Sequence, residues 1–156
     1  MAYIKGSERH DTCFLCDAAD ADGSSDAEIY VVARGEHAFV ILNAFPYNTG
    51  HLMVAPHRHV GELDDLTHDE VDEIWAWTRR TVAAHREASG PDGFNIGINL
   101  GQAAGAGVPG HFHLHVVPRW GGDTNFMPVV GDAKVLPEML AETYQRLRPL
   151  LADEPS

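Results

Sequence analysis

The sequence lacks the features that several common classes of protein require. It contains no run near the roughly 20 consecutive apolar residues of a membrane-spanning helix. Residues 1–6 contain no apolar signal core, so we expect neither membrane insertion nor secretion. Basic residues are scarce, because 11 Lys and Arg stand against 23 Asp and Glu, for a formal net charge of −12. Since such a surface repels nucleic-acid backbones and anionic membranes, we expect neither as a partner. The lack of a signal core leads us to expect a cytoplasmic protein.

Cysteine is scarce as well, and its placement is informative. Cys13 and Cys16 are the only two, in the spacing C-x-x-C. This spacing is compatible with a redox pair, a chance pair or half of a zinc site. No thioredoxin-like βαβ pattern surrounds it, and an intracellular location argues against a structural disulfide. Tetrahedral zinc would need two further ligands, for which histidine is abundant. The candidates are His59 and His111, with His51 and His57 as close rivals.

Histidine is the residue type in excess, and six of the ten histidines fall within 51–59 and 111–115. His111, His113 and His115 alternate with apolar residues, which is the period of a β-strand. One face of that strand would face a core, and the other would carry three imidazoles. Because a buried imidazole needs partners for two nitrogens, this face indicates a site that handles protons, phosphate or metal near neutral pH. The competing interpretation is an exposed strand with solvated histidines. The remaining histidines expected to be solvated are His10, His37, His68 and His85.

The order of the predicted elements indicates one α+β domain over 1–156 with a mostly antiparallel sheet. Thr67 and Glu70 form a capping box, and an amphipathic helix follows it to about Ser89. Residues 1–12 are expected to form an N-terminal arm, 17–27 a mobile acidic loop and 136–151 a C-terminal helix. Strands are predicted over 28–34, 37–43, 51–56, 94–100 and 112–118.

The heptad His-Phe-His-Leu-His-Val-Val at 111–117 resembles the signature of the histidine-triad (HIT) superfamily. Further segments fit the same family: 42–54 is similar to its nucleotide-binding segment, and Pro-His-Arg-His at 56–59 lies where members carry Pro-x-x-His. Residues 99–101 and 118–123 also fit, so that the resemblance covers most of 13–130. Residues 120–128 are similar to a bacterial, Fhit-like branch that includes diadenosine tetraphosphate phosphorylases.

The resemblance implies a fold and a reaction. The HIT-like fold is a five-stranded antiparallel sheet with one long helix, here joined by a C-terminal helix, and members are usually homodimers. The implied enzyme cleaves dinucleoside polyphosphates, such as diadenosine tetraphosphate, at the α-phosphate. A nucleotidyl-His113 intermediate forms, and either inorganic phosphate or water resolves it. Magnesium is expected only as a companion of the nucleotide substrate.

The resemblance also implies roles for individual residues. His113 would be the nucleophile, and His115 would hold phosphate oxygens or assist the leaving group. His51 would lie against the same phosphates, Asn43 would bind the ribose hydroxyls, and Asn99 would approach the phosphate or ribose. Backbone N–H groups of Gly105 and Gly107 would come near the phosphate. Zinc-bearing members use two cysteines, the Pro-x-x-His histidine and the first triad histidine. The matching residues for a structural zinc are Cys13, Cys16, His59 and His111.

One position departs from the family pattern. Many members place Gln-Ser or Gln-Thr four residues before the first triad histidine, whereas this chain has Gly107 and Val108. The phosphates would then be bound through backbone groups, or the site would leave room for a second anion. Two alternative functions stay open: an adenylyl-amide hydrolase of the same superfamily, which cleaves P–N bonds, and a metal-binding or nucleotide-sensing protein whose triad is a ligand set.

Overall fold

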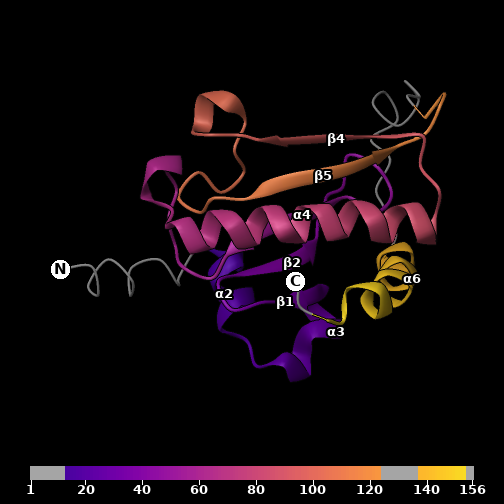
Figure 1. Cartoon of the computed structure of the whole chain (residues 1–156), viewed down its shortest axis with the longest axis horizontal. Helices are drawn as coiled ribbons and strands as arrows, with labels where there is room; N and C mark the ends of the chain where they lie inside the picture. The colour runs from indigo at the N-terminus through magenta and orange to yellow at the C-terminus, as the bar shows by residue number, and fades with distance from the viewer. Residues whose placement is uncertain (1–12, 124–136, 154–156) are drawn as a thin grey trace.

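The computed structural model describes residues 13–123 and 137–153, and within them five strands form one antiparallel sheet in the order β1-β2-β3-β5-β4. Figure 1 shows the long helix α4 lying across one face of this sheet. The strands are β1 (Val31–Arg34), β2 (Ala38–Leu42), β3 (Leu52–Pro56), β4 (Gly93–Ile98) and β5 (Leu114–Arg119). The α+β prediction with a five-stranded antiparallel sheet is confirmed.

The long helix α4 runs from His68 to Ala88 and begins at the predicted capping box. Thr67 Oγ1 accepts a hydrogen bond from the Glu70 backbone N–H, and the Glu70 carboxylate accepts one from the Thr67 N–H. Trp77 is fully buried against the sheet while Trp75 is half exposed, as expected for two residues that cannot share one helical face. This helix and the sheet enclose the main hydrophobic core.

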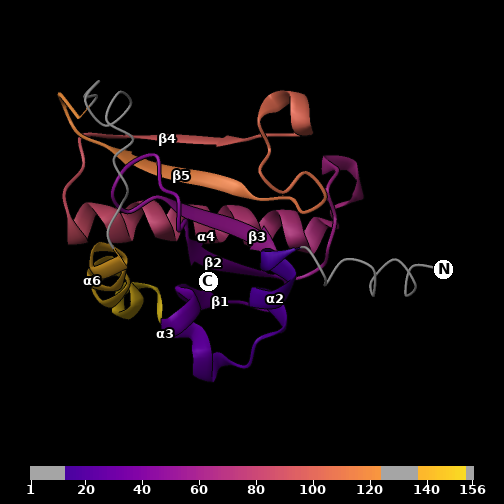
Figure 2. The same cartoon turned by 180° about the vertical axis from the view of Figure 1, so that it is seen from behind.

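Alternation along the strands divides the buried residues between the two faces of the sheet. Val40 and Leu42 of β2 join the core under α4, whereas Phe39 and Ile41 join a second cluster on the opposite face. That second cluster includes Leu15 of helix α2 (Phe14–Asp20), which the reverse view in Figure 2 shows on the side away from α4. The sheet is therefore covered on both faces near β1, β2 and β3.

The segment 17–27, predicted as a loop, is mostly helical. Helix α2 extends to Asp20, a short 3-10 helix covers Gly23–Ser25, and helix α3 covers Asp26–Ile29. An ion pair between Asp26 and Arg34 of β1, at 2.7 Å, fixes this region, and the same guanidinium donates to the carbonyl oxygen of Ala18. Because these contacts join residues 8 and 16 positions apart, the local acidic composition could not reveal them.

The starts of two strands differ from the predictions by two residues or more. The first strand begins at Val31 rather than at residue 28, because α3 occupies Asp26–Ile29 and Tyr30 has a left-handed backbone with φ 62°. The last strand begins at Leu114 rather than at residue 112. The C-terminal helix is confirmed as α6 (Pro137–Leu147), followed by a 3-10 helix at Arg148–Leu151. The arm 1–12, residue 136 and most of 120–128 lie outside the described residues. No helix in the described ranges is long and apolar enough to cross a membrane.

Candidate active site and metal centre

The three histidines of the triad lie on the sheet face opposite α4. Phe112, Leu114 and Val116 turn into the core under α4, so that the alternating histidines point the other way. In β5, His115 lies opposite Met53 of β3 and Gly97 of β4. His111, His113 and His115 are 1%, 6% and 9% exposed, and therefore the interpretation as solvated histidines is wrong.

His51 and His115 form a hydrogen-bonded pair of imidazoles. The Tyr47 backbone N–H donates to His51 Nδ1 at 3.1 Å, and His51 Nε2 lies 2.8 Å from His115 Nδ1. A neutral imidazole carries one hydrogen, so the accepting Nδ1 places the His51 hydrogen on Nε2, which donates to His115. The hydrogen of His115 must then lie on its Nε2. That atom is buried and has no hydrogen-bond partner among the described residues.

Burial keeps both imidazoles of this pair neutral. Desolvation lowers the pKa of His51 from 6.5 to about 3, helped by the nearby charges that His115 and His113 would carry. Desolvation also lowers the pKa of His115 to about 4, with His113 as the second cause. Near pH 7 the pair therefore presents an uncharged N–H donor at His115 Nε2.

His113 is oriented by the backbone of another triad member. Its Nδ1 lies 2.8 Å from the carbonyl oxygen of His111, and a carbonyl oxygen can only accept. Nδ1 of His113 is consequently the protonated nitrogen, and Nε2 keeps its lone pair. The rings of His113 and His115 lie edge to face, with centroids 4.9 Å apart. A nucleophilic nitrogen and an N–H donor thus come from neighbouring rings.

The remaining predicted nucleotide-binding residues divide into two groups. Asn43 lies with the histidines, since its Nδ2 is 3.4 Å from His51 Nδ1 and its Oδ1 accepts from the Phe45 N–H. Asn99, Gly105 and Gly107 lie in the connection between β4 and β5. Among the described residues, no hydrogen bond joins these three to His51, His113 or His115. Gly105 has φ 86°, a backbone conformation that favours glycine, whereas a side chain at Gly107 would meet open space.

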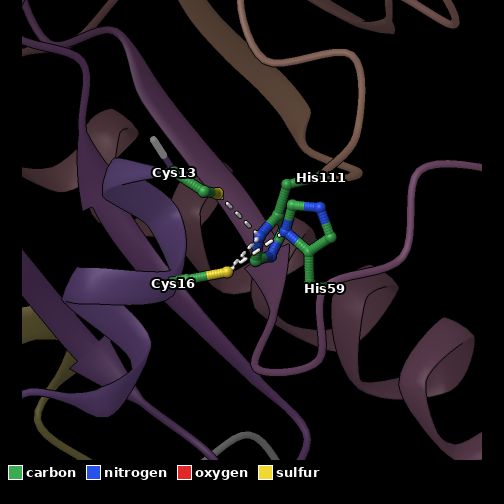
Figure 3. Close-up of side chains that lie close together, drawn as sticks. All are labelled: Cys13, Cys16, His59 and His111. Atoms are coloured by element: carbon green, nitrogen blue, oxygen red, sulfur yellow. Dashed lines mark hydrogen bonds between the residues drawn. The ribbon is translucent and has the colours of Figure 1, made fainter. Parts of the chain in front are cut away.

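Two cysteines and two histidines, one of which is His111, come together in a second group of side chains. Figure 3 shows Cys13 and Cys16 approaching His59 and His111 from the start of α2. The Nδ1 of His111 lies 3.4 Å from Cys13 Sγ and 3.5 Å from Cys16 Sγ, and the Nδ1 of His59 lies 3.1 Å from Cys16 Sγ. All four ligand atoms lie within 4.8 Å of one another. The four residues, Cys13, Cys16, His59 and His111, are called the Cys-His cluster below.

The geometry of the Cys-His cluster fits a tetrahedral metal ion. A sulfur and a nitrogen that share a zinc ion at its usual bond lengths lie roughly 3.5 Å apart. His111 Nε2 donates to the carbonyl oxygen of Pro56 at 2.9 Å, which leaves Nδ1 of the neutral ring unprotonated and able to bind a metal ion. Both rival ligands lie elsewhere, because His57 Nε2 donates to the Gly35 carbonyl at 2.9 Å and His51 pairs with His115. Cys13 and Cys16 are not joined by a disulfide.

Four residues near the site were not found from the sequence pattern. The Tyr47 ring lies over His51, with centroids 4.8 Å apart, and near His115. The carboxylate of Asp123 accepts from Asn48 Nδ2 at 2.7 Å and so holds the turn that precedes His51. Turn and loop residues of this kind have no periodicity that could reveal them. Tyr47, Asn48 and Asp123 were indicated only by the family resemblance, because they lie in segments that are similar to the family pattern.

His85, the fourth of these residues, was expected to be solvated and is 2% exposed. It lies under the turn before His51: a Cβ at Gly50 would come within 2.7 Å of His85 Cε1. Burial lowers the pKa of His85 to about 4, against the effect of a hydrogen bond with the Gly50 backbone. His85 lies at helical spacing from Thr78 and Thr81 and shares their buried face of α4, so its position on the helix, not its residue type, explains the burial.

Comparisons with known proteins agree with this geometry. A family model described as the HIT domain matches residues 25–122. A protein of Mycobacterium tuberculosis (strain ATCC 25618 / H37Rv) named AP-4-A phosphorylase is 48% identical over 131 residues, which are 84% of this chain and 67% of the relative. A protein of Dictyostelium discoideum named Bis(5'-adenosyl)-triphosphatase is 34% identical over 84 residues, which are 54% of this chain and 56% of that relative.

A solved structure is similar over most of its length. The crystal structure of a Zn-bound histidine triad family protein from Mycobacterium smegmatis superposes with a TM-score of 0.72 at 34% sequence identity. The match covers 90% of this chain and 94% of that chain. The fold is therefore the HIT fold.

Proposed function

The chain belongs to the HIT family, and on that basis we propose that it cleaves dinucleoside polyphosphates such as diadenosine tetraphosphate at the α-phosphate. The observation that carries the proposal is the pair of complementary groups on His113 and His115. His113 Nδ1–H is bound to the His111 carbonyl, so its Nε2 lone pair is available for attack. The adjacent His115 Nε2–H is a buried donor without a partner among the described residues.

These groups support a reaction in two displacements. His113 Nε2 attacks the α-phosphorus, a P–N bond forms, and the bond from phosphorus to the bridging oxygen breaks. His115 Nε2–H donates a hydrogen bond to that departing oxygen and stabilises its developing charge without losing the proton; the oxygen leaves as ATP when the substrate is diadenosine tetraphosphate. In the second step an oxygen of phosphate or water attacks phosphorus and breaks the P–N bond. The product is ADP with phosphate and AMP with water.

His51 has a different part in this proposal from the one expected. Its side chain is fully buried, and both ring nitrogens are engaged, Nδ1 with the Tyr47 N–H and Nε2 with His115. We propose that His51 touches no phosphate and acts on the substrate only through His115, whose tautomer it sets.

The other substrate contacts remain proposals of the same kind. Asn43, beside His51, is proposed to bind the ribose hydroxyls of the transferred nucleotide. Asn99, Gly105 and Gly107 are proposed to approach the phosphates, the glycines through their backbone N–H groups. Magnesium would enter with the polyphosphate.

We propose phosphate as the preferred second nucleophile. The support is the 48% identity with the relative named AP-4-A phosphorylase. Gly107 and Val108 provide no side-chain hydroxyl or amide where many family members have one. Phosphate would therefore have to bind through backbone N–H groups of the loop before His111.

We propose that the Cys-His cluster binds a structural zinc ion. Zinc is supported by the two sulfur and two nitrogen ligands, by the Nε2–H of His111 bound to Pro56, and by the Zn-bound relative. Four protein ligands would fill a tetrahedral zinc site, so the ion would have a structural role and would tie the N-terminal residues to the segment that carries the nucleophile.

A homodimer and a cytoplasmic location complete the proposal. Strand β4 lies at the edge of the sheet, and Asn95, Ile96 and Gly97 of this strand are exposed. An exposed strand edge with an apolar side chain favours pairing with a second copy of the chain. Cys13 and Cys16 form no disulfide, which agrees with a reducing compartment. Light scattering after size exclusion would show a dimer mass, and a monomer mass would contradict the pairing.

The experiment that tests the function is product analysis with diadenosine tetraphosphate, with and without inorganic phosphate, by ion-exchange chromatography. ADP and ATP formed only with phosphate would support phosphorolysis. AMP and ATP formed without it would identify a hydrolase. No cleavage would contradict the proposal and make adenylyl-amides the next substrates to try. The His113→Asn variant must lose turnover and keep its metal; loss of both would support a ligand role for the triad.

A further inference from the structure

The proposed nucleophile lies outside the hydrogen-bonded part of the sheet. Pairing of β5 with β3 and with β4 ends at Leu114, which lies opposite Val54 and Ile98. His113 precedes that position, and His111 lies two residues further from it. Neither residue is held by strand pairing, so the position of His113 depends on contacts of another kind.

Those contacts hold the backbone of 110–113 from several directions. The Phe112 N–H donates to the Val60 carbonyl at 2.6 Å, and the His111 N–H donates to the Val108 carbonyl at 3.1 Å. The neighbouring backbone is closely packed, because a Cβ at Gly61 would come within 2.7 Å of the Pro109 carbonyl oxygen. The Phe112 N–H lies in the same planar peptide as the His111 carbonyl, so its bond to Val60, the residue after His59, helps to set the direction of that carbonyl.

His111 is the residue where this segment meets the metal centre. Its ring is held by the Pro56 carbonyl at Nε2 and faces Cys13 and Cys16 with Nδ1. Its own carbonyl oxygen accepts from His113 Nδ1 at 2.8 Å. Ring and carbonyl belong to one residue, so anchoring the ring on both sides limits how far the His111 Cα and the carbonyl that orients His113 can shift.

We propose that His111 is a positioning residue that couples the Cys-His cluster to the nucleophile: metal bound through its ring holds its carbonyl where it fixes the tautomer and orientation of His113. The inference rests on the proposed function, because His113 is the nucleophile only there. Without the metal, the cluster keeps two sulfurs and two imidazoles at 3.1 to 3.5 Å with no ion to join them. The ring of His111 then loses one of its two anchors.

The consequence for the reaction follows from the geometry of attack. A displacement of about 1 Å at a reacting atom can cost about 100-fold in rate. Loss of a group that supports a metal ligand or its neighbours typically costs 10- to 100-fold, roughly the same range. We therefore expect kcat to fall on the order of 10- to 100-fold when the metal is removed, with KM little changed because no substrate contact is lost.

The test uses the full chain with and without metal and two readouts. Zinc is removed with a chelator, and circular dichroism confirms that the protein stays folded. Steady-state rates give kcat and KM, and nitrogen-15 spectra of labelled histidine report which ring nitrogen of His113 carries the hydrogen. We expect lower kcat and a mixture of His113 tautomers in the metal-free protein. Adding zinc back should restore the original kcat and the single tautomer of His113.

Two substitutions provide a matched comparison. His59→Ala removes a cluster ligand whose ring lies beside Gly110, so it should reproduce the metal-free protein in both readouts. His57→Ala removes a histidine two residues away whose ring binds the Gly35 carbonyl, so it should keep metal, kcat and the single His113 tautomer. If chelation unfolds the protein, exchange of zinc for the larger cadmium ion tests the same coupling, with an intermediate kcat expected.

The outcomes separate this inference from the proposed function. A folded metal-free or cadmium-exchanged protein with unchanged kcat and an unchanged His113 tautomer would overturn the coupling. A zinc-loaded protein that cleaves no nucleotide substrate would overturn the proposed function. In that case a change of His113 tautomer on metal removal would still support the positioning role of His111.

Discussion

His51 and His115 are joined by a 2.8 Å hydrogen bond whose direction is set by a backbone group outside the pair, the N–H of Tyr47. Because the Tyr47 N–H donates to His51 Nδ1, the hydrogen of His51 lies on Nε2 and is donated to His115. The hydrogen of His115 therefore lies on its Nε2, at the end of this series of hydrogen bonds. The family signature contains three histidines, but the protonation pattern of the site depends on a fourth histidine and on the turn at 47–51.

The proposed role of His115 predicts a change in sensitivity to the leaving group. His115→Asn should slow cleavage of diadenosine tetraphosphate by about 100- to 1,000-fold, the usual cost of removing a hydrogen-bond donor aimed at developing charge. The loss should grow as the leaving group becomes more basic, because a poorer leaving group needs the N–H donor more. Rates for a series of aryl esters of AMP, plotted against the pKa of the phenol, would measure this dependence.

The slope of that plot is the decisive quantity. It should be steeper for His115→Asn than for the unaltered protein, and steeper to a smaller degree for His51→Leu, which removes only the partner of His115. His68→Gln is the matched control, since His68 is exposed at the start of α4. Equal slopes for all four proteins would mean that His115 does not assist the leaving group.

Buried neutral histidines should make stability depend on pH in a defined range. Burial lowers the pKa of His51 to about 3 and the pKa values of His85 and His115 to about 4, from 6.5. Between these values and 6.5 the unfolded chain binds protons that the folded chain does not. The free energy of unfolding is therefore fully present above the unfolded pKa and falls as the pH drops towards 4.

Urea denaturation at several pH values between 7 and 4 would measure this loss. Each histidine can contribute at most about 1.4 kcal/mol per pH unit. His85→Asn should reduce the slope of the free energy of unfolding against pH, whereas His68→Gln should leave it as it is. Comparing variants at each pH removes the common effect of metal loss. An unchanged slope in His85→Asn would show that His85 takes up a proton in the folded protein.

The turn before His51 should tolerate no side chain at Gly50. Gly50 has φ 84°, and a Cβ there would lie 2.7 Å from His85 Cε1 and 3.3 Å from Pro118 Cγ. Gly90 provides the control, because it has φ 55° and a Cβ there would meet nothing within 4 Å. Gly90→Ala should cost only the backbone penalty of about 1–2 kcal/mol in the free energy of unfolding. Gly50→Ala should cost more and should also lower kcat, and equal costs would contradict the close contact with His85.

The residues whose local pattern is strong were predicted correctly. The alternation through 111–117 predicted which side chains enter the core, and Thr67 with Glu70 marked the start of α4, because each signal is contained in a few neighbouring residues. The Cys-His cluster needed the family resemblance as well. Spacing alone left His51 and His57 as rivals of His59 and His111, since nothing local indicates which distant rings meet.

Elements held by distant contacts were predicted less well. Residues 17–27 have the composition of a loop, but Arg34 binds Asp26 and the end of α2 from another strand. Alternation continues back to His111, but ladder pairing begins only at Leu114, because β3 and β4 pair no further. Periodicity reports which face a side chain occupies and does not report where backbone pairing stops.

Asp123 provides the last test, because it connects the end of β5 to the turn at 47–51. Its carboxylate accepts from Asn48 Nδ2, from the Arg119 guanidinium and from the Trp120 N–H, and the Asn48 carbonyl accepts from the His51 N–H. Asp123→Ala should therefore release Asn48 and loosen the pairing of His51 with His115. We expect a fall in kcat of about 10-fold, within the range for groups that support a reactive residue, and a lower midpoint of urea denaturation.

Asp92 is the matched control for that variant. Within residues 13–123 and 137–153 its carboxylate accepts one hydrogen bond, from the Gly121 N–H, and its side chain is exposed on the same end of the sheet. Asp92→Ala should lower the denaturation midpoint slightly and keep kcat. Nitrogen-15 spectra of His51 and His115 distinguish positioning from stability: the Asp123 variant should show a mixture of tautomers at both rings, and the Asp92 variant should not. A destabilised Asp123 variant with unchanged kcat and unchanged tautomers would mean that Asp123 supports the fold and not the pair of histidines.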